Sequence, residues 1–191
     1  MREVLRMKRC YGIGIAAFCI CLSLFLAGSH FISLGVMKGS LESDARKSQK
    51  IDAGWKAVSA HSDKFSAVLF YDESQSQGSY ALYETHNRRP SVGYFLKAEG
   101  SLADTDIVEG IQGYGYGNGF AVLSMNKVNA VRVERVLEKE NLPKESREVV
   151  PGKPFAVTFS SHDHSHNGTI TVYDAEGRSI PFDSFVITEC Y

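Results

Sequence analysis

The sequence predicts an all-β fold, an antiparallel β-sandwich-like domain preceded by one N-terminal transmembrane helix. A basic start is followed by a stretch from Cys10 to Met37 without any Asp, Glu, Lys or Arg. From Phe65 onward, short runs of apolar or alternating residues are separated by turn residues, which is the pattern of antiparallel strands. The pair Asn167-Gly168 lies between two such runs and is the strongest hairpin signal in the chain.

The N-terminal segment has the charge pattern of a membrane anchor. Residues 1–9 carry four basic side chains against the single acid Glu3. As a helix rising about 1.5 Å per residue, residues 10–37 would extend about 40 Å, more than the roughly 30 Å hydrocarbon core of a bilayer. The positive-inside rule leaves the basic N-terminus in the cytoplasm and the rest of the chain outside. We therefore expect a single-pass protein of the cell membrane with an extracytoplasmic domain.

A cleaved signal peptide is the alternative interpretation of the same segment. It would combine the basic start, the apolar run from Ile13 to Ala27 and the small residues Ala27-Gly28-Ser29 as a cleavage site. Apolar residues continue from Phe31 to Met37, past that site, which favours the uncleaved anchor. Both interpretations export the remaining chain.

The placement of the cysteines excludes a domain built on disulfides. Three of the four lie in or beside the apolar span, and Cys190 is the one that is exported. The core must then come from hydrophobic packing, which a domain of this length can supply. Cys190 is either free or paired between chains.

Residues 38–64 are predicted to form a juxtamembrane stalk that is partly helical. Leu41, Ala45 and Trp55 recur at loose helical intervals among charged residues. Trp55 either packs the stalk onto the domain or contacts the membrane interface or a partner, and packing is the simpler role. The extracytoplasmic β-rich domain then covers residues 65–191.

Seven or eight strands, with a further one at the edge, can be drawn in that domain. Turns rich in Gly, Asn, Asp or Pro separate most of them, and no long internal repeat is evident. Two successive meanders are compatible with two packed sheets. The expected strands are 66–71, 80–85, 92–98, 107–112, 120–125, 130–137, 155–160 and 169–173, with 185–187 at the edge.

Five glycines crowd the segment from Gly110 to Gly119, with Tyr114 and Tyr116 among them. No Lys-Ser or Lys-Thr follows, so the segment is not a phosphate-binding loop. Glycine here supplies a bulge, a positive φ or a close approach of backbones. The functional alternative is an aromatic-lined ligand groove built from Tyr114, Tyr116 and Phe120.

His162, His164 and His166 alternate along one segment. On an extended strand they would point to one face and could present their imidazoles to a single metal ion, with zinc or copper as the natural candidates. The run directly precedes Asn167-Gly168, so a solvated hairpin arm explains it equally well. Apart from such a metal, no cofactor is expected.

Composition and missing motifs narrow the classes of function. Lys and Arg (21) nearly balance Asp and Glu (22), which gives no electrostatic indication of nucleic-acid binding. The chain has no Gly-x-Ser-x-Gly, no His-Glu-x-x-His and no exported cysteine with a nearby histidine. An enzyme is therefore less expected than a binding protein.

The C-terminal part resembles uncharacterised exported proteins of Gram-positive, spore-forming bacteria that have a short N-terminal anchor and a small β domain. The residues that carry the resemblance are Gly119–Leu123, Val128–Val133 and the hairpin Ile170–Ile180 with its Tyr-Asp-x-acid-Gly-base pattern. The resemblance implies an anchored, exported β domain and supplies no activity or catalytic residue. The histidine run departs from it.

Together these observations predict a membrane-anchored extracytoplasmic binding or interaction module whose partner is another extracytoplasmic protein. Loops on a rigid β scaffold commonly carry binding. An exported metal-binding domain that uses the three histidines is the alternative, and a hydrolase with an unrecognised site is a third hypothesis.

Overall fold

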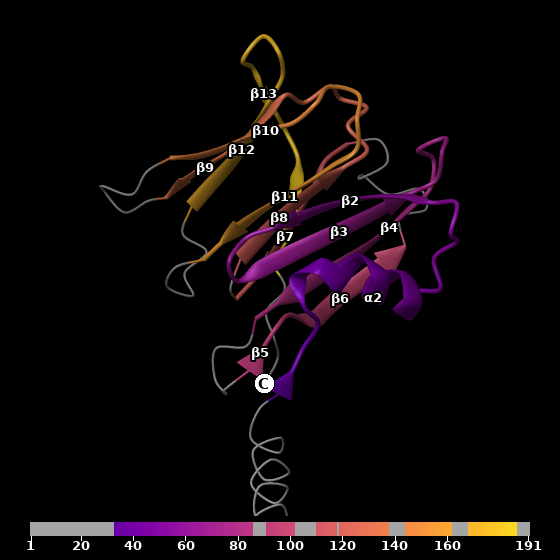
Figure 1. Ribbon diagram of the computed structural model, residues 1–191. Coiled ribbons are helices and arrows are strands. Elements are labelled where there is room, and N and C mark those ends of the chain that lie inside the picture. Colours follow the sequence, from indigo (N-terminus) through magenta and orange to yellow (C-terminus); the bar gives the residue numbers. More distant parts are fainter. Residues whose placement is uncertain are drawn as a thin grey trace, which may run out of the picture.

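The computed structural model describes residues 33–85, 91–101, 110–117, 119–137, 144–161 and 168–186. These residues form three four-stranded sheets, mostly antiparallel, one α-helix and a two-stranded pairing near the start. The sheets stack face to face, and the helix covers the outer face of the first one (Figure 1). The prediction of an antiparallel β domain is confirmed.

The first sheet has the strand order β2-β3-β4-β6 and is antiparallel throughout. Successive side chains of β3 point to opposite faces. Ala67 and Leu69 pack toward the second sheet, while Val68 and Phe70 pack under the helix. Burial on both faces explains why β3 reads as an almost continuous apolar run. The strands are β2 (Lys56–His61), β3 (Phe65–Tyr71), β4 (Gly78–Glu84) and β6 (Phe95–Ser101).

The helix α2 (Leu41–Ser48) follows the single 3₁₀ turn η1 (Lys38–Ser40). Leu41 and Ala45, four residues apart, are its buried residues, as expected for one apolar stripe on a helix. The hydroxyl of Tyr83 in β4 donates a hydrogen bond of 2.8 Å to Asp44. The helix is thus part of the domain.

The stalk predicted at residues 38–64 is helical only in part. Lys56–His61 form β2, the end strand of the first sheet, because every second residue, such as Val58, packs toward the core between the sheets. Trp55 is half-buried against the cluster under α2, as the packing interpretation expects. This segment is integrated into the fold by a strand that the loose helical spacing concealed.

The second sheet lies in the middle of the stack and has the order β11-β8-β7-β14. Its strand β14 pairs with β7 in parallel, and the other pairs are antiparallel. Both faces are buried: Leu123 packs toward the first sheet and Val122 toward the third. The strands are β7 (Gln112–Tyr116), β8 (Gly119–Ser124), β11 (Phe155–Ser160) and β14 (Asp183–Val186).

The glycine-rich segment is itself strand β7 together with the start of β8. Of the strand expected at 107–112, residues 107–109 lie outside the described ranges, and Gly110 and Ile111 are not in a strand. A Cβ on Gly113 would come within 2.6 Å of the Phe120 ring. A Cβ on Gly119 would come within 2.5 Å of the Phe65 Cβ and 2.6 Å of the Phe159 carbonyl oxygen. Glycine is needed here for close approach, as the structural interpretation of these residues expects.

The third sheet has the order β10-β9-β12-β13. Val133 and Val172 point from it toward the second sheet and meet Val157 in a shared core. Its end strand β10 was not predicted, because its four residues are all polar or charged. The strands are β9 (Arg132–Leu137), β10 (Glu145–Glu148), β12 (Gly168–Tyr173) and β13 (Ser179–Ile180).

The described chain begins with residues that the sequence assigned to the end of the membrane anchor. Strand β1 (Ser33–Leu34) pairs in parallel with β5 (Ser91–Val92), and Val36 bridges Tyr94. The prediction of a continuous apolar helix to Met37 is therefore wrong for these last residues, since an uncharged run does not distinguish a helix end from a strand. Within the described ranges, no helix is long and apolar enough to cross a membrane; residues 10–32 lie outside those ranges.

Candidate binding groove

The aromatic residues predicted to form a ligand groove do not come together. Tyr114 and Tyr116 are 8% and 4% exposed and lie in the core between the first and second sheets. Tyr114 stacks on Tyr80 with ring centroids 4.6 Å apart, and burial raises its pKa. Phe120 packs on the opposite face of the second sheet. These three side chains therefore line no common surface.

The histidine run falls outside the described residues, so the structure says nothing of metal binding by His162, His164 and His166. Among the residues that are described, no group of three or more His, Cys, Asp or Glu could hold a metal ion. His61, which is described, forms a hydrogen bond of 3.2 Å between its Nδ1 and the hydroxyl of Ser66 on the helix side of β2. Burial, with the nearby charge of Lys38, lowers the pKa of His61. Zinc or copper binding stays a prediction.

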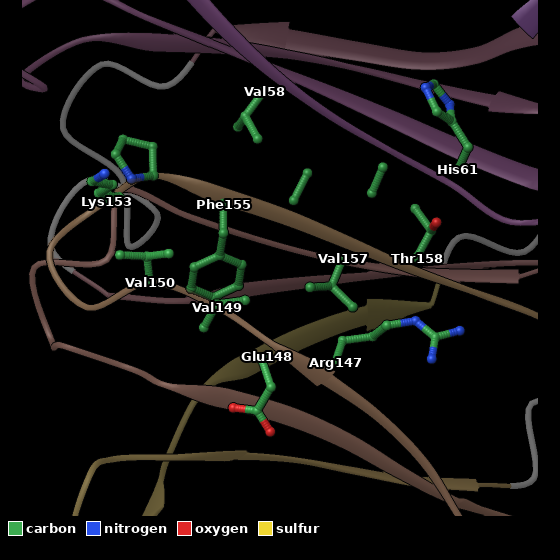
Figure 2. A pocket seen from close by; sticks show the side chains of 13 residues that line it. Val58, His61, Arg147, Glu148, Val149, Val150, Lys153, Phe155, Val157 and Thr158 are labelled. Atoms are coloured by element: carbon green, nitrogen blue, oxygen red, sulfur yellow. The ribbon is translucent and has the colours of Figure 1, made fainter.

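A groove of about 430 Å³ opens where the three sheets end on one side of the stack. Within the described part of the chain, β2, β11 and β10 are the end strands of the first, second and third sheets. All three contribute to the lining, together with residues 149–154 that connect β10 to β11. We call this feature the edge groove (Figure 2).

The edge groove follows the free edge of β11 between two walls. On the upper wall, Val58 of β2 faces the side of β11 that carries Ala156, and both pack against the core between the first two sheets. On the lower wall, Phe155 and Val157 of β11 face Val149 in the core shared with the third sheet. Residues of β11 alternate between the two walls, so the strand edge itself forms the floor.

The charged side chains of the lining are mostly basic. Arg147 and Lys153 line the edge groove with Glu148 as the one acid. Arg147 pairs across the sheet with inward-facing Val133, whereas Glu148 alternates to the other face and turns away from β11 in Figure 2. The edge groove therefore presents a net positive charge at its lower wall.

Two buried polar atoms, one in the lining of the groove and one beside it, have no hydrogen-bond partner. One is Oγ1 of Thr158, a residue that is 4% exposed and lines the groove. The other is Nε of Arg135, a residue that is 6% exposed and whose guanidinium lies 5.1 Å from the Phe159 ring. An unpaired buried polar group costs free energy in the free chain. Buried polar groups without a partner are rare in folded proteins, so each of the two calls for an explanation, such as a group supplied by a bound molecule.

The backbone edge of β11 is also unpaired on the groove side. In an antiparallel pair, every second residue directs its N–H and C=O away from its neighbour, and β8 is the one strand that pairs with β11 in the described chain. Phe155, Val157, Thr158 and Phe159 are all buried, so part of this outward backbone is shielded whichever residues face outward. A shielded, unpaired strand edge is a template for another strand.

Sequence reasoning did not find the edge groove. It needs β2 and β10, which the sequence did not predict as strands, and β2 lies far from β10 and β11 in the chain. The strand Phe155–Ser160 was predicted with its observed bounds, but its position at a sheet edge depends on long-range pairing. No local pattern in residues 145–148, which are all polar or charged, indicates a strand there.

Comparison of the chain with protein-family models, with curated proteins and with solved structures found no match. The resemblance to exported proteins of spore-forming bacteria thus remains an expectation from the sequence.

Proposed function

We propose that this chain is an interaction module, anchored in the cell membrane by its apolar N-terminal segment, that binds a segment of a partner protein outside the cytoplasm. Its stacked sheets serve as a β-sandwich-like scaffold that holds the edge groove rigid. The observation that carries the proposal is the unpaired, largely buried edge of β11, enclosed by β2 and β10.

The partner segment binds by strand addition. An extended segment beside β11 would pair with the outward N–H and C=O groups and extend the second sheet by one strand. Its side chains would alternate between the upper wall at Val58 and the lower wall at Val149. Main-chain hydrogen bonds would supply affinity, and the two walls would supply specificity.

The chemistry of the lining supports binding rather than catalysis. Thr158 is the hydroxyl residue of the lining. His61 also lines the groove, and its imidazole is hydrogen-bonded to Ser66, a buried residue outside the lining. A nucleophile needs a base within hydrogen-bond reach. The described lining offers no such pair, while its apolar walls fit the side chains of a peptide.

Site-specific photo-crosslinking in the native membrane tests this function. A photoreactive phenylalanine analogue replaces half-buried Ala60, which lines the groove, or its exposed neighbour Ser59, which points to the other side of the same strand. We expect crosslinks to a partner polypeptide from position 60 but not from position 59. An analogue at Val58, which also lines the groove, should give the same crosslinks. These crosslinks should disappear when Ala60→Trp fills the groove. Equal crosslinking from positions 59 and 60 would contradict the proposal.

The membrane orientation needs a separate test. In a chain whose native cysteines are replaced by alanine, Lys47→Cys on the exposed side of α2 should react with a membrane-impermeant maleimide in intact cells. Lys8→Cys in the basic N-terminus should react only after permeabilisation. Labelling of Lys8→Cys in intact cells would overturn the orientation with the N-terminus inside.

A further inference from the structure

The lower wall of the edge groove holds an excess of positive charge. Arg135 and Arg147 both approach Glu145, by a hydrogen bond from Arg135 Nη2 and at 3.8 Å from Arg147 Nη2. Two guanidinium groups therefore share one carboxylate. The side chain of Arg147 is 53% exposed, so it can reorient toward a ligand without leaving a buried site.

The two arginines are held over one aromatic ring. Their guanidinium carbons lie 5.1 and 5.8 Å from the centroid of Phe159, with Arg135 the closer. A cation over an aromatic ring is stabilised there without being neutralised. Arg147 Nη1 donates to the carbonyl oxygen of Ser146 at 3.0 Å. The positive charge thus lies beside the end of β11 that carries Thr158.

The alternation of side chains along β11 places the charge of Arg147 near the unpartnered hydroxyl of Thr158. Thr158 and Phe159 are consecutive on β11 and point to opposite walls. A strand added beside β11 would present one side chain to the upper wall near Thr158 and the next to the lower wall near Arg147. Figure 2 shows both residues at the same end of the groove, with Val58 and Phe155 toward the other end.

We propose that the edge groove selects an extended peptide segment with an acidic side chain, which pairs with β11 and places its carboxylate against Arg147. This inference rests on the proposed function and adds to it the chemical character of the partner segment. The neighbouring residue of the segment places a hydrogen-bonding group against the unpartnered hydroxyl of Thr158. Residues toward the other end of the segment are apolar, to match Val58 and Phe155. A carboxylate is the group that an arginine fork binds best.

Selection from a random decapeptide display library against the purified full chain in detergent tests the inference. We expect the enriched peptides to alternate apolar residues and to carry Asp or Glu at one fixed position. Changing that acid to its amide should weaken binding at least tenfold, and so should Arg147→Ala. The matched control is Arg178→Ala, an arginine with 74% side-chain exposure in the turn before β13, which should leave binding unchanged.

The Ala60→Trp variant separates the two levels of the proposal. Enriched peptides that Ala60→Trp blocks, but that lack a fixed acid or are insensitive to Arg147→Ala, would overturn the acidic specificity and leave strand addition standing. If no enriched peptide is blocked by Ala60→Trp, strand addition in the groove fails and the acidic specificity with it. Acidic peptides that depend on both Arg147 and the open groove would support both.

Discussion

The hydroxyl of Thr158 is the single atom that most sharply distinguishes the edge groove from an ordinary core. Valine has nearly the same shape and would fill the same place without a polar atom to satisfy. A structure that served stability alone would gain from that exchange. The presence of threonine at a 4% exposed position is consistent with a hydrogen bond that only a bound partner supplies.

Replacing this hydroxyl should therefore stabilise the free chain and weaken its binding. We expect Thr158→Val to raise the free energy of unfolding by about 1 kcal/mol, because a buried unsatisfied hydroxyl is removed. Thr169→Val, at an exposed position of β12, should change it by less than about 0.5 kcal/mol. Urea denaturation followed by circular dichroism measures both. A clear destabilisation by Thr158→Val would show that its hydroxyl already has a partner in the free chain.

Asp72 holds the turn between β3 and β4 through its carboxylate. It accepts hydrogen bonds from the hydroxyl of Ser74 and from the backbone N–H groups of Gln77 (2.9 Å) and Ser76 (2.8 Å). These bonds lower the pKa of Asp72 from 3.8 to about 2. A depressed carboxylate pKa contributes stability that is complete above the unfolded value and is lost as the pH falls toward the folded value.

The urea midpoint of the wild-type chain should accordingly fall between pH 3.8 and about 2 more steeply than that of Asp72→Asn. The amide cannot titrate, so this variant lacks that part of the pH dependence. Exposed Glu73→Gln, at the neighbouring position, serves as the control and should keep the wild-type slope in this window. Identical slopes for wild type and Asp72→Asn would contradict the assigned hydrogen bonds.

At the scale of secondary-structure elements, the strands that the sequence predicts best are short runs rich in apolar, β-branched or aromatic residues. Phe155–Ser160 and Gly168–Tyr173 follow this rule. The hairpin expected between them is wrong, because β11 pairs with β8 and β12 pairs with β9 in different sheets. The end strands β2 and β10 were not predicted, because half or more of their residues are polar and their pairing partners are distant or strongly charged. Strand β7 was not predicted at its observed position, because glycine has a low strand propensity. The glycines of this strand leave room for the aromatic rings that pack over it.

Helix α2 tests whether the predicted stalk belongs to the folded domain. Leu41→Ala removes a side chain that is 1% exposed in the cluster over the first sheet. It should lower the free energy of unfolding by about 2–4 kcal/mol, from lost burial and the cavity left behind. Lys47→Ala on the exposed side should change it by less than about 0.5 kcal/mol. Fluorescence of Trp55, the single tryptophan, reports the unfolding transition. An unchanged free energy of unfolding for Leu41→Ala would show that the helix does not pack on the core.

At the scale of the whole molecule, the stack of one helix and three sheets has two consequences. The middle sheet is covered on both faces, which gives rigid, apolar packing through the centre. It also brings three end strands to one side, where neither of the two neighbouring sheets supplies a partner for the edge of β11 within the described chain. The site is thus a property of tertiary arrangement, and composition or local pattern could not predict it.

The sequence nevertheless limited the kinds of function before the fold was known. The near balance of charge gives no basis for nucleic-acid binding, and the missing catalytic motifs lower the expectation of an enzyme. It could not place Tyr114 and Tyr116, whose alternation with glycine resembles a surface loop but whose rings lie in the core. The difference depends on which face of β7 meets another sheet, and that is decided by packing.

Amide hydrogen exchange of the full chain, with and without an enriched acidic peptide, tests the central claim most directly. In the free chain, β11 residues that point to β8 should exchange slowly and the alternate residues faster. The peptide should slow exchange at those alternate residues of Phe155–Ser160 and leave the hairpin β12–β13 unchanged. Protection that appears elsewhere, with β11 unaffected, would contradict strand addition in the edge groove.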